Sequence, residues 1–277
     1  MADNNSAFLK RVGSAVLAGF ILLGMGVYGG DRGLLLVCSV AVVLGIREYA
    51  RMAFKHWNMP AGVGICFWVV GLSCYMAMFL RAEFAEVWFS LANVAFITGA
   101  MWVARGKVTN ENLLAAIALG VFGMIYCVLF PYFAARLVQL DMGGQWFLFL
   151  LLVVFFGDTF AYFGGRWFGK QKFMPMISPN KTWQGSVGGL LGSAVAGGVH
   201  VAATFQDVSL WKTVLFCVVC GFAAQSGDLL MSLVKRVAQV KDSGTIMPGH
   251  GGVLDRLDGV FIASPLVYAF ALYVRPI

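Results

Sequence analysis

Charged residues are scarce in this sequence of 277 amino acids, where Asp, Glu, Lys and Arg together contribute only 12%. A typical soluble domain has about 25% charged and about 45–50% apolar residues. Here 60% of the residues are hydrophobic. The shortage of charge therefore excludes intrinsic disorder and a large water-soluble domain.

Cysteine occurs in no arrangement that builds a disulfide framework or a zinc site. All six cysteines lie inside apolar stretches, and the single CxxC pair, Cys217 and Cys220, has no second pair and no nearby histidine. This excludes a secreted disulfide scaffold and a structural zinc site. We expect the thiols to be small, buried side chains.

Long apolar stretches dominate the sequence instead. A membrane helix needs roughly 20 apolar residues, and only helices or closed barrels satisfy the backbone in hydrocarbon. The sequence therefore predicts an all-α, polytopic integral membrane protein with about nine transmembrane helices. The second stretch is short, and we expect it to be tilted or to extend past Arg47. The nine stretches are 12–28, 33–46, 61–80, 84–104, 112–131, 145–166, 185–206, 209–230 and 259–275.

Lys and Arg are distributed unevenly between the connections. With nine spans, 15 of the 20 cations lie on the side of the N-terminus and five on the other. The positive-inside rule then places the N-terminus, and the long polar connections 166–184 and 231–258, in the cytoplasm. The net charge of +7 follows from such loops, with a phosphate-rich ligand as the alternative, and we expect no nucleic-acid partner.

The first five or so spans carry few ionisable groups, and the character of the chain changes from Asp158 onward, which suggests two regions. We expect residues 1–140 to form a scaffold of transmembrane helices that contributes dimer contacts, and residues 141–277 to form the catalytic region. Charges at membrane depth are costly and usually functional. Asp228, with Ser232 and Lys235, lies at i, i+4 and i+7, on one helix face suited to a metal–phosphate unit. The alternatives are a helix-end Asp158 paired with a neighbouring helix and a simple charge network within one helix.

The densest polar segment runs from Lys241 to Asp258. Glycines flank His250 and allow the backbone to approach a ligand closely. Asp255 and Asp258 are spaced i, i+3, so a helix beginning there would turn both carboxylates the same way. With Asp228 they would supply three hard oxygen ligands, which favours Mg²⁺ over zinc. A polar turn before the last span is the alternative interpretation.

The connection after 145–166 is basic and rich in hydroxyl groups. Residues 164–170 match GxxxxGK, but no Ser or Thr follows and no strand precedes them, so a Walker-type phosphate loop is rejected. Together with the carboxylates, this connection indicates metal-assisted phosphoryl or nucleotidyl transfer at the membrane surface. Its polar residues are Arg166, Lys170, Ser178, Lys181 and Thr182.

The 27 residues from Ser232 to Asp258 resemble the signature of the phosphatidate cytidylyltransferase (CDP-diacylglycerol synthase) family. The matching elements are Ser232-x-x-Lys235-Arg236, Lys241-Asp242-Ser243-Gly244 and the run from Pro248 to Asp258. Asp158 with Tyr162, Gly165–Lys170 and Ser178-Pro179-x-Lys181-Thr182 also resemble family segments.

The resemblance implies transfer of CMP from CTP to phosphatidic acid, giving CDP-diacylglycerol and pyrophosphate. It implies Mg²⁺, a second cation such as K⁺, a homodimer, and a multi-pass protein of the bacterial plasma (inner) membrane whose site faces the cytoplasm. Metal ligands would be Asp228, Asp255 and Asp258. Catalytic residues would be Lys181, Ser232, Lys235, Arg236, Lys241, Asp242, His250 and Arg256. Substrate-binding residues would be Asp158, Arg166, Lys170, Ser178, Thr182, Gly251 and Gly252.

Two other classes of protein stay open. One is another CTP-dependent membrane lipid phosphotransferase or kinase; a CDP-alcohol phosphatidyltransferase would need an Asp-Gly-x-x-Ala-Arg element, which the sequence lacks. The other is an ion-coupled transporter, which needs ionisable groups near mid-membrane in several spans, whereas the charges here gather late in the chain.

Overall fold

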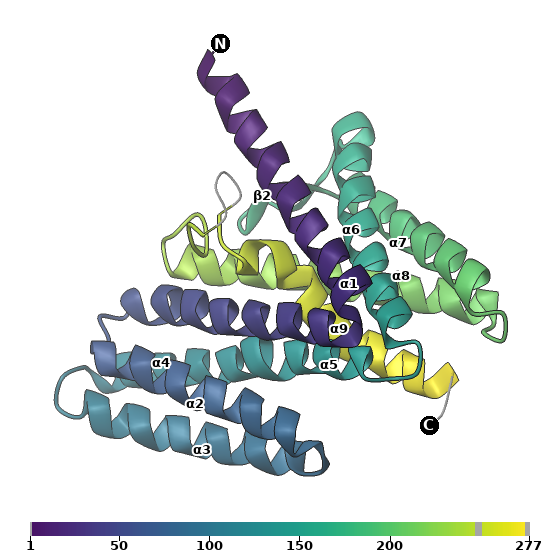
Figure 1. Ribbon diagram of the computed structural model, residues 1–277. Helices are drawn as coiled ribbons and strands as arrows, with labels where there is room; N and C mark the ends of the chain where they lie inside the picture. Colours follow the sequence, from purple (N-terminus) through teal and green to yellow (C-terminus); the bar gives the residue numbers. More distant parts are fainter. Residues whose placement is uncertain (1, 247–250, 275–277) are drawn as a thin grey trace. The chain divides into compact units, whose positions relative to one another are not determined.

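A computed structural model describes residues 2–246 and 251–274, with side chains from residue 19 onward (Figure 1). The chain divides into two compact units. The first comprises Met1–Tyr132 and Val234–Arg256, and the second comprises Phe133–Leu233 and Leu257–Ile277. The helices are α1 (Ala2–Lys55), α2 (Ala61–Leu80), η1 (Ala82–Phe84), α3 (Ala85–Ala104), α4 (Asn110–Met124), η2 (Ile125–Leu129), α5 (Phe130–Val138), α6 (Gly143–Phe168), α7 (Trp183–Thr204), α8 (Leu210–Val237) and α9 (Leu254–Val274).

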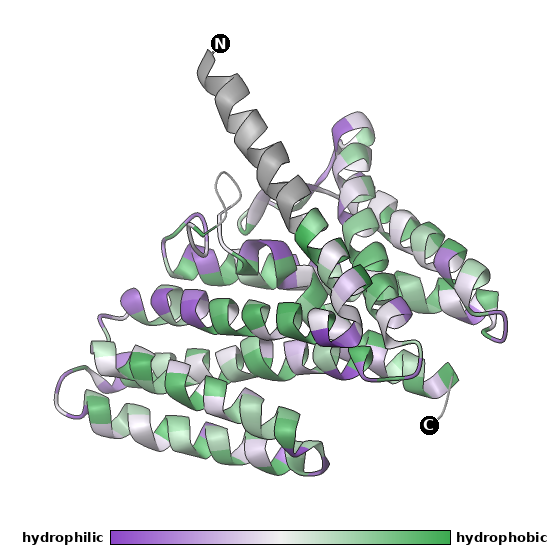
Figure 2. Ribbon diagram, in the orientation of Figure 1, coloured by the Kyte–Doolittle hydropathy of each residue, from purple (hydrophilic) through white to green (hydrophobic). Residues whose placement is uncertain are grey.

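The helical, polytopic architecture predicted from hydropathy is confirmed, with eight helical spans rather than nine in the described residues. The stretches 12–28 and 33–46 fall within α1, which is interrupted at Gly30 by non-helical backbone angles (φ 54°, ψ −142°). A positive φ of this kind suits glycine, and Figure 1 shows α1 changing direction between its two arms. Figure 2 shows hydrophobic residues along the long helices and hydrophilic residues near their ends.

In the first unit, the second arm of α1 packs against α2 and α4 through aromatic rings. Tyr49 lies with its ring centroid 5.7 Å from that of Phe67 and donates a hydrogen bond to the carbonyl of Leu119 (2.8 Å). A Cβ at Gly123 would overlap the rings of Tyr49 and Phe67, so only glycine lets α4 come this close. This packing holds the C-terminal end of α1 rigidly.

In the second unit, α6 and α7 pack closely because small residues line their shared face. Ser193 of α7 donates to the carbonyl of Val153 of α6 (2.8 Å), and a Cβ at Gly189 would lie 2.9 Å from the carbonyl oxygen of Gly157. Near the other end of the pair, Trp146 stacks on Phe205 with a centroid distance of 4.2 Å. Glycine and serine therefore let these two helices approach closely.

Two glycines of α7 offer a matched test of this contact. A Cβ at Gly192 would lie 2.6 Å from Cβ of Phe160 and 2.8 Å from the carbonyl oxygen of Phe156, whereas one at Gly198 would meet ordinary contacts of 3.4 Å and more. We expect Gly192→Ala to destabilise the protein by about 1–3 kcal/mol through overpacking. Gly198→Ala should be neutral or gain about 1 kcal/mol of helix propensity. Thermal unfolding in detergent measures both, and equal melting temperatures would contradict the close contact.

The two long polar connections are shorter than predicted, because the helices beside them extend further. The first contains an antiparallel hairpin of β1 (Lys172–Met174) and β2 (Ser178–Thr182). Strands this short leave too little alternation for a sequence pattern to reveal them. In the second connection, α8 extends to Val237 and α9 begins at Leu254, so both helices carry residues that were predicted to lie in the loop.

Candidate active site

A cavity of about 490 Å³ in the second unit gathers ionisable residues from α6, β2 and α8. Asp158 and Arg166 come from α6, Lys181 from β2 and Asp228 from α8. Sequence analysis assigned these four residues separately to metal, substrate and catalytic roles. The structure brings them to one cavity, in which two carboxylates and two cations face a common space.

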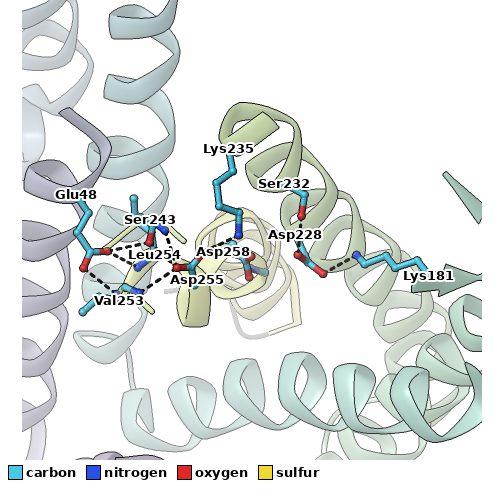
Figure 3. A network of polar contacts seen from close by, with 12 residues as sticks. Glu48, Lys181, Asp228, Ser232, Lys235, Ser243, Val253, Leu254, Asp255 and Asp258 are labelled. Carbon is cyan, nitrogen blue, oxygen red and sulfur yellow. Dashed lines mark hydrogen bonds and ion pairs between the residues drawn. The ribbon is translucent and has the colours of Figure 1, made fainter. Parts of the chain in front are cut away.

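Lys181 and Asp228 form an ion pair in this cavity. Lys181 Nζ lies 2.6 Å from Asp228 Oδ2, and the two side chains keep 27% and 36% of their surface exposed (Figure 3). Ser232, one turn further along α8, donates to Asp228 Oδ1 at 3.4 Å, as the i, i+4 spacing predicts. An ion pair that remains open to solvent can exchange partners with an incoming anion and its counter-ion.

Thr182, the residue after Lys181, is the N-cap of α7. It ends β2 and caps α7, with its hydroxyl accepting a hydrogen bond from the backbone N–H of Gly185 (3.1 Å). A threonine in an extended conformation before a helix satisfies one of the unpaired N–H groups of the first turn. Lys181 therefore sits directly before a helix start and lines the cavity.

Gln184 is hydrogen-bonded to the residues that precede β1. Its Oε1 accepts hydrogen bonds from the backbone N–H groups of Lys170 (3.1 Å) and Gln171 (3.3 Å). The amide thus closes the turn between α6 and β1. Lys170 is exposed there, and Ser178 begins β2.

Two residues that the sequence analysis did not select form a polar wall of the cavity. Gln225 of α8 donates to the carbonyl of Ser186 (3.0 Å), while the hydroxyl of Ser186 donates to Gln225 Oε1. Both residues line the cavity, as does Tyr162, whose hydroxyl accepts from Arg166 (3.2 Å). Gln225 lies three residues before Asp228 on α8, so helical spacing places both on one face. This spacing could have identified Gln225 from the sequence.

A hydrogen-bond network in the first unit joins the signature residues Lys235, Ser243, Gly252 and Asp255 (Figure 3). Asp255 Oδ1 accepts from Lys235 Nζ at 2.6 Å. Its Oδ2 accepts from the Ser243 N–H (2.8 Å), the Ser243 hydroxyl (2.9 Å) and the Gly252 N–H (3.0 Å). Asp255 therefore links Lys235, Ser243 and Gly252. Its role as a metal ligand stays a prediction.

Glu48 of α1 belongs to the same network, although no role was predicted for it from the sequence. Its side chain is buried, with 2% relative exposure for the residue. It accepts from the N–H groups of Val253 (3.1 Å) and Leu254 (3.0 Å). An acidic residue in an apolar stretch is the signal that marks such a position.

The other predicted site residues lie on or beside the signature segment. Asp258, in the first turns of α9, is buried and accepts from the N–H of Gly259 (2.8 Å). Gly251 has a positive φ of 80°, which favours glycine. His250 lies outside the described residues. The exposed members of the set are Arg236, Lys241, Asp242 and Arg256.

The donor set of the cavity fits a magnesium ion. Within each unit, as far as the structure describes it, no three His, Cys, Asp or Glu side chains are grouped to hold a metal. Mg²⁺ is commonly bound by one or two carboxylates together with waters and substrate phosphates. Asp158 and Asp228, which line the same cavity, supply that number of carboxylates.

These features define a class: a multi-pass helical membrane protein with a cavity lined by two carboxylates and two cationic side chains. The model of the cytidylyltransferase family matches residues 9–274, and the chain belongs to this family.

Relatives with known names resemble this chain to different extents. A phosphatidate cytidylyltransferase of Brucella abortus is 45% identical over 150 residues, covering 52% of this chain and 55% of the relative. One of Staphylococcus saprophyticus is 44% identical over 125 residues, covering 45% and 48%. These alignments thus span about half the length of the bacterial relatives. Phosphatidate cytidylyltransferase 5, chloroplastic, of Arabidopsis thaliana is 30% identical over 295 residues, covering 96% of this chain and 72% of the relative.

Proposed function

We propose that this protein is a phosphatidate cytidylyltransferase, which transfers CMP from CTP to phosphatidic acid and releases pyrophosphate. One observation carries the proposal: Asp158, Arg166, Lys181 and Asp228 line a single cavity. Carboxylates that hold a divalent ion and cations that hold phosphate oxygens are the groups that nucleotidyl transfer requires. The names of the relatives support the choice of substrates.

In this proposal the phosphate oxygen of phosphatidic acid attacks the α-phosphorus of CTP. A new P–O bond forms, and the bond from the α-phosphorus to the bridging oxygen of the pyrophosphate breaks. The attacking monoester is already an anion near neutral pH, so no strong general base is needed. Lys181 and Arg166 hold phosphate oxygens and orient the two anions, because positioning and charge stabilisation supply most of such catalysis.

Asp158 and Asp228 would hold Mg²⁺ in the cavity, and the bound ion would neutralise the triphosphate and the leaving pyrophosphate. Lys181 then exchanges its ion pair with Asp228 for contacts to phosphate oxygens. The assignments of Lys235, Arg236 and Lys241 to further phosphate contacts, of Asp255 and Asp258 to metal, and of a second cation such as K⁺ are retained as part of the proposal.

We infer that the cavity opens toward the cytoplasm of a bacterial plasma membrane. The connections after α1, α3, α6 and α8, together with the helix ends beside them, carry 13 of the 20 Lys and Arg residues, and these connections share one side however α1 crosses. This assignment therefore survives the change from nine spans to eight. A homodimer is proposed from the family resemblance alone.

The proposal is tested with purified protein in detergent micelles containing phosphatidic acid and Mg²⁺. Each of the four ribonucleoside triphosphates is supplied in turn, and release of pyrophosphate is measured. We expect release with CTP that depends on phosphatidic acid and is lost when EDTA removes the metal. Release of nucleoside diphosphate instead would identify a lipid kinase, and no release with any nucleotide would overturn the proposal.

A further inference from the structure

Glu48 lies in the region that was predicted to form a scaffold, yet it contacts two parts of the signature segment. In the first part, the hydroxyl of Ser243 lies 3.2 Å from Glu48 Oε2. In the second part, the N–H groups of Val253 and Leu254 donate to its two carboxylate oxygens at 3.1 Å and 3.0 Å. These contacts link residues that are 195 to 206 positions apart in the sequence.

The hydrogen-bond donors around Glu48 suit a carboxylate. A buried charge is costly unless it is paired or hydrogen-bonded, and among the described residues Glu48 forms no ion pair. Its partners are instead two N–H groups at the start of α9, a helix of 21 residues. The positive end of the helix dipole and these free N–H groups stabilise a negative charge.

Glycines of the signature segment make room for this carboxylate. A Cβ at Gly244 would overlap Glu48 Oε1, and a Cβ at Gly252 would overlap Glu48 Oε2 and the hydroxyl of Ser243. Neither glycine has a positive φ, so the backbone conformation does not require glycine at these positions. The close approach of the Glu48 side chain does. The segment is therefore shaped around the side chain of Glu48.

The network continues from Glu48 to the ion pair of the signature. The Ser243 hydroxyl lies within hydrogen-bond distance of both Glu48 (3.2 Å) and Asp255 (2.9 Å) and shares its single proton between them. Asp255 also accepts from Gly252 and from Lys235. The Lys235 and Asp255 side chains are only 15% and 7% exposed. A shift of Ser243 or of Gly252 would therefore move the Asp255 carboxylate, which pairs with Lys235.

We propose that Glu48 is a positioning residue for CMP transfer, acting by clamping Ser243 to the first turn of α9 and thereby aligning Asp255 and Lys235. The proposal rests on the proposed function, because it assumes that the Lys235–Asp255 pair serves that reaction. Glu48 touches neither substrate in this mechanism. Its effect passes through backbone N–H groups and one hydroxyl.

The test compares Glu48→Gln and Glu48→Asp with Glu86→Gln, a matched control because Glu86 is exposed on α3. The amide of Glu48→Gln turns a donor toward N–H groups, whereas Glu48→Asp keeps an acceptor of the same charge. Hydrogen exchange of the peptide 251–258 in the full-length protein reports the clamp directly. The first turn of α4, capped by Thr109, serves as the internal reference.

We expect Glu48→Gln to speed exchange of this peptide about tenfold, the order of one lost hydrogen bond, and to lower turnover at least about tenfold. Glu48→Asp should retain more of both properties, and Glu86→Gln should match the wild type. Unchanged exchange in Glu48→Gln, or faster exchange with unchanged turnover, would overturn the positioning role. If the wild type transfers no CMP while Glu48→Gln still loosens the segment, the proposed function fails and the clamp stands.

Discussion

Asp228→Asn should lower the rate of CMP transfer at least about 100-fold, which corresponds to about 3 kcal/mol of transition-state stabilisation. The substitution keeps the size of the side chain but removes the charge that would bind the metal and that now pairs with Lys181 at 2.6 Å. Initial rates of pyrophosphate release from CTP, measured at saturating phosphatidic acid, check this expectation. Asp31→Asn, at an exposed position of α1, is the matched control.

A double variant separates a catalytic role of this pair from a structural one. If Lys181 and Asp228 only neutralise each other, removing both charges in Lys181→Met with Asp228→Asn should restore what the single variants lose. If both residues bind substrate or metal, the double variant should stay as inactive as either single variant. Near-wild-type turnover in the double variant would refute the assignment of this cavity as the active site.

Asp255→Asn should be the more damaging substitution for folding. It leaves the Lys235 ammonium, whose side chain is 15% exposed, without its carboxylate, and it turns an amide donor toward Lys235 or toward the Ser243 and Gly252 donors. Removing one partner of a largely buried ion pair costs about 3 kcal/mol or more. We expect a lower melting temperature together with a loss of turnover of at least about 100-fold.

Thermal unfolding in detergent and the pyrophosphate assay measure the two effects separately. Asp31→Asn again controls for the loss of one negative charge at an exposed position. A melting temperature equal to that of the wild type would contradict the network drawn around Asp255. A variant that melts early but turns over normally would show that this network is structural only.

Several features of the site could be predicted because they depend on neighbouring residues. The i, i+4 contact of Ser232 with Asp228 follows from helical spacing, and the start of α9 at Leu254 places Asp255 in its first turn. These predictions required only the local chain. The role of Thr182 as the N-cap of α7, which places Lys181 beside a helix start, was not predicted, although it too is local.

Other features depend on contacts between distant parts of the chain. The pairing of Lys181 with Asp228, the wall made by Ser186 and Gln225, and the clamp by Glu48 join residues 39 or more positions apart. No local pattern of polarity specifies which distant donor meets which acceptor. The hairpin of β1 and β2 escaped prediction for another reason, since its strands have only three and five residues.

The amino-acid sequence by itself determined the helical membrane architecture and the family, because hydrocarbon demands long apolar helices and the signature residues lie close together along the chain. Only the tertiary structure decided that α1 is one helix broken at Gly30 and that Asp158, Arg166, Lys181 and Asp228 line one cavity. It also made Glu48, for which no role was predicted from the sequence, an acceptor for the start of α9. A buried carboxylate takes its role from the donors that folding brings to it, and those donors are not its neighbours in the chain.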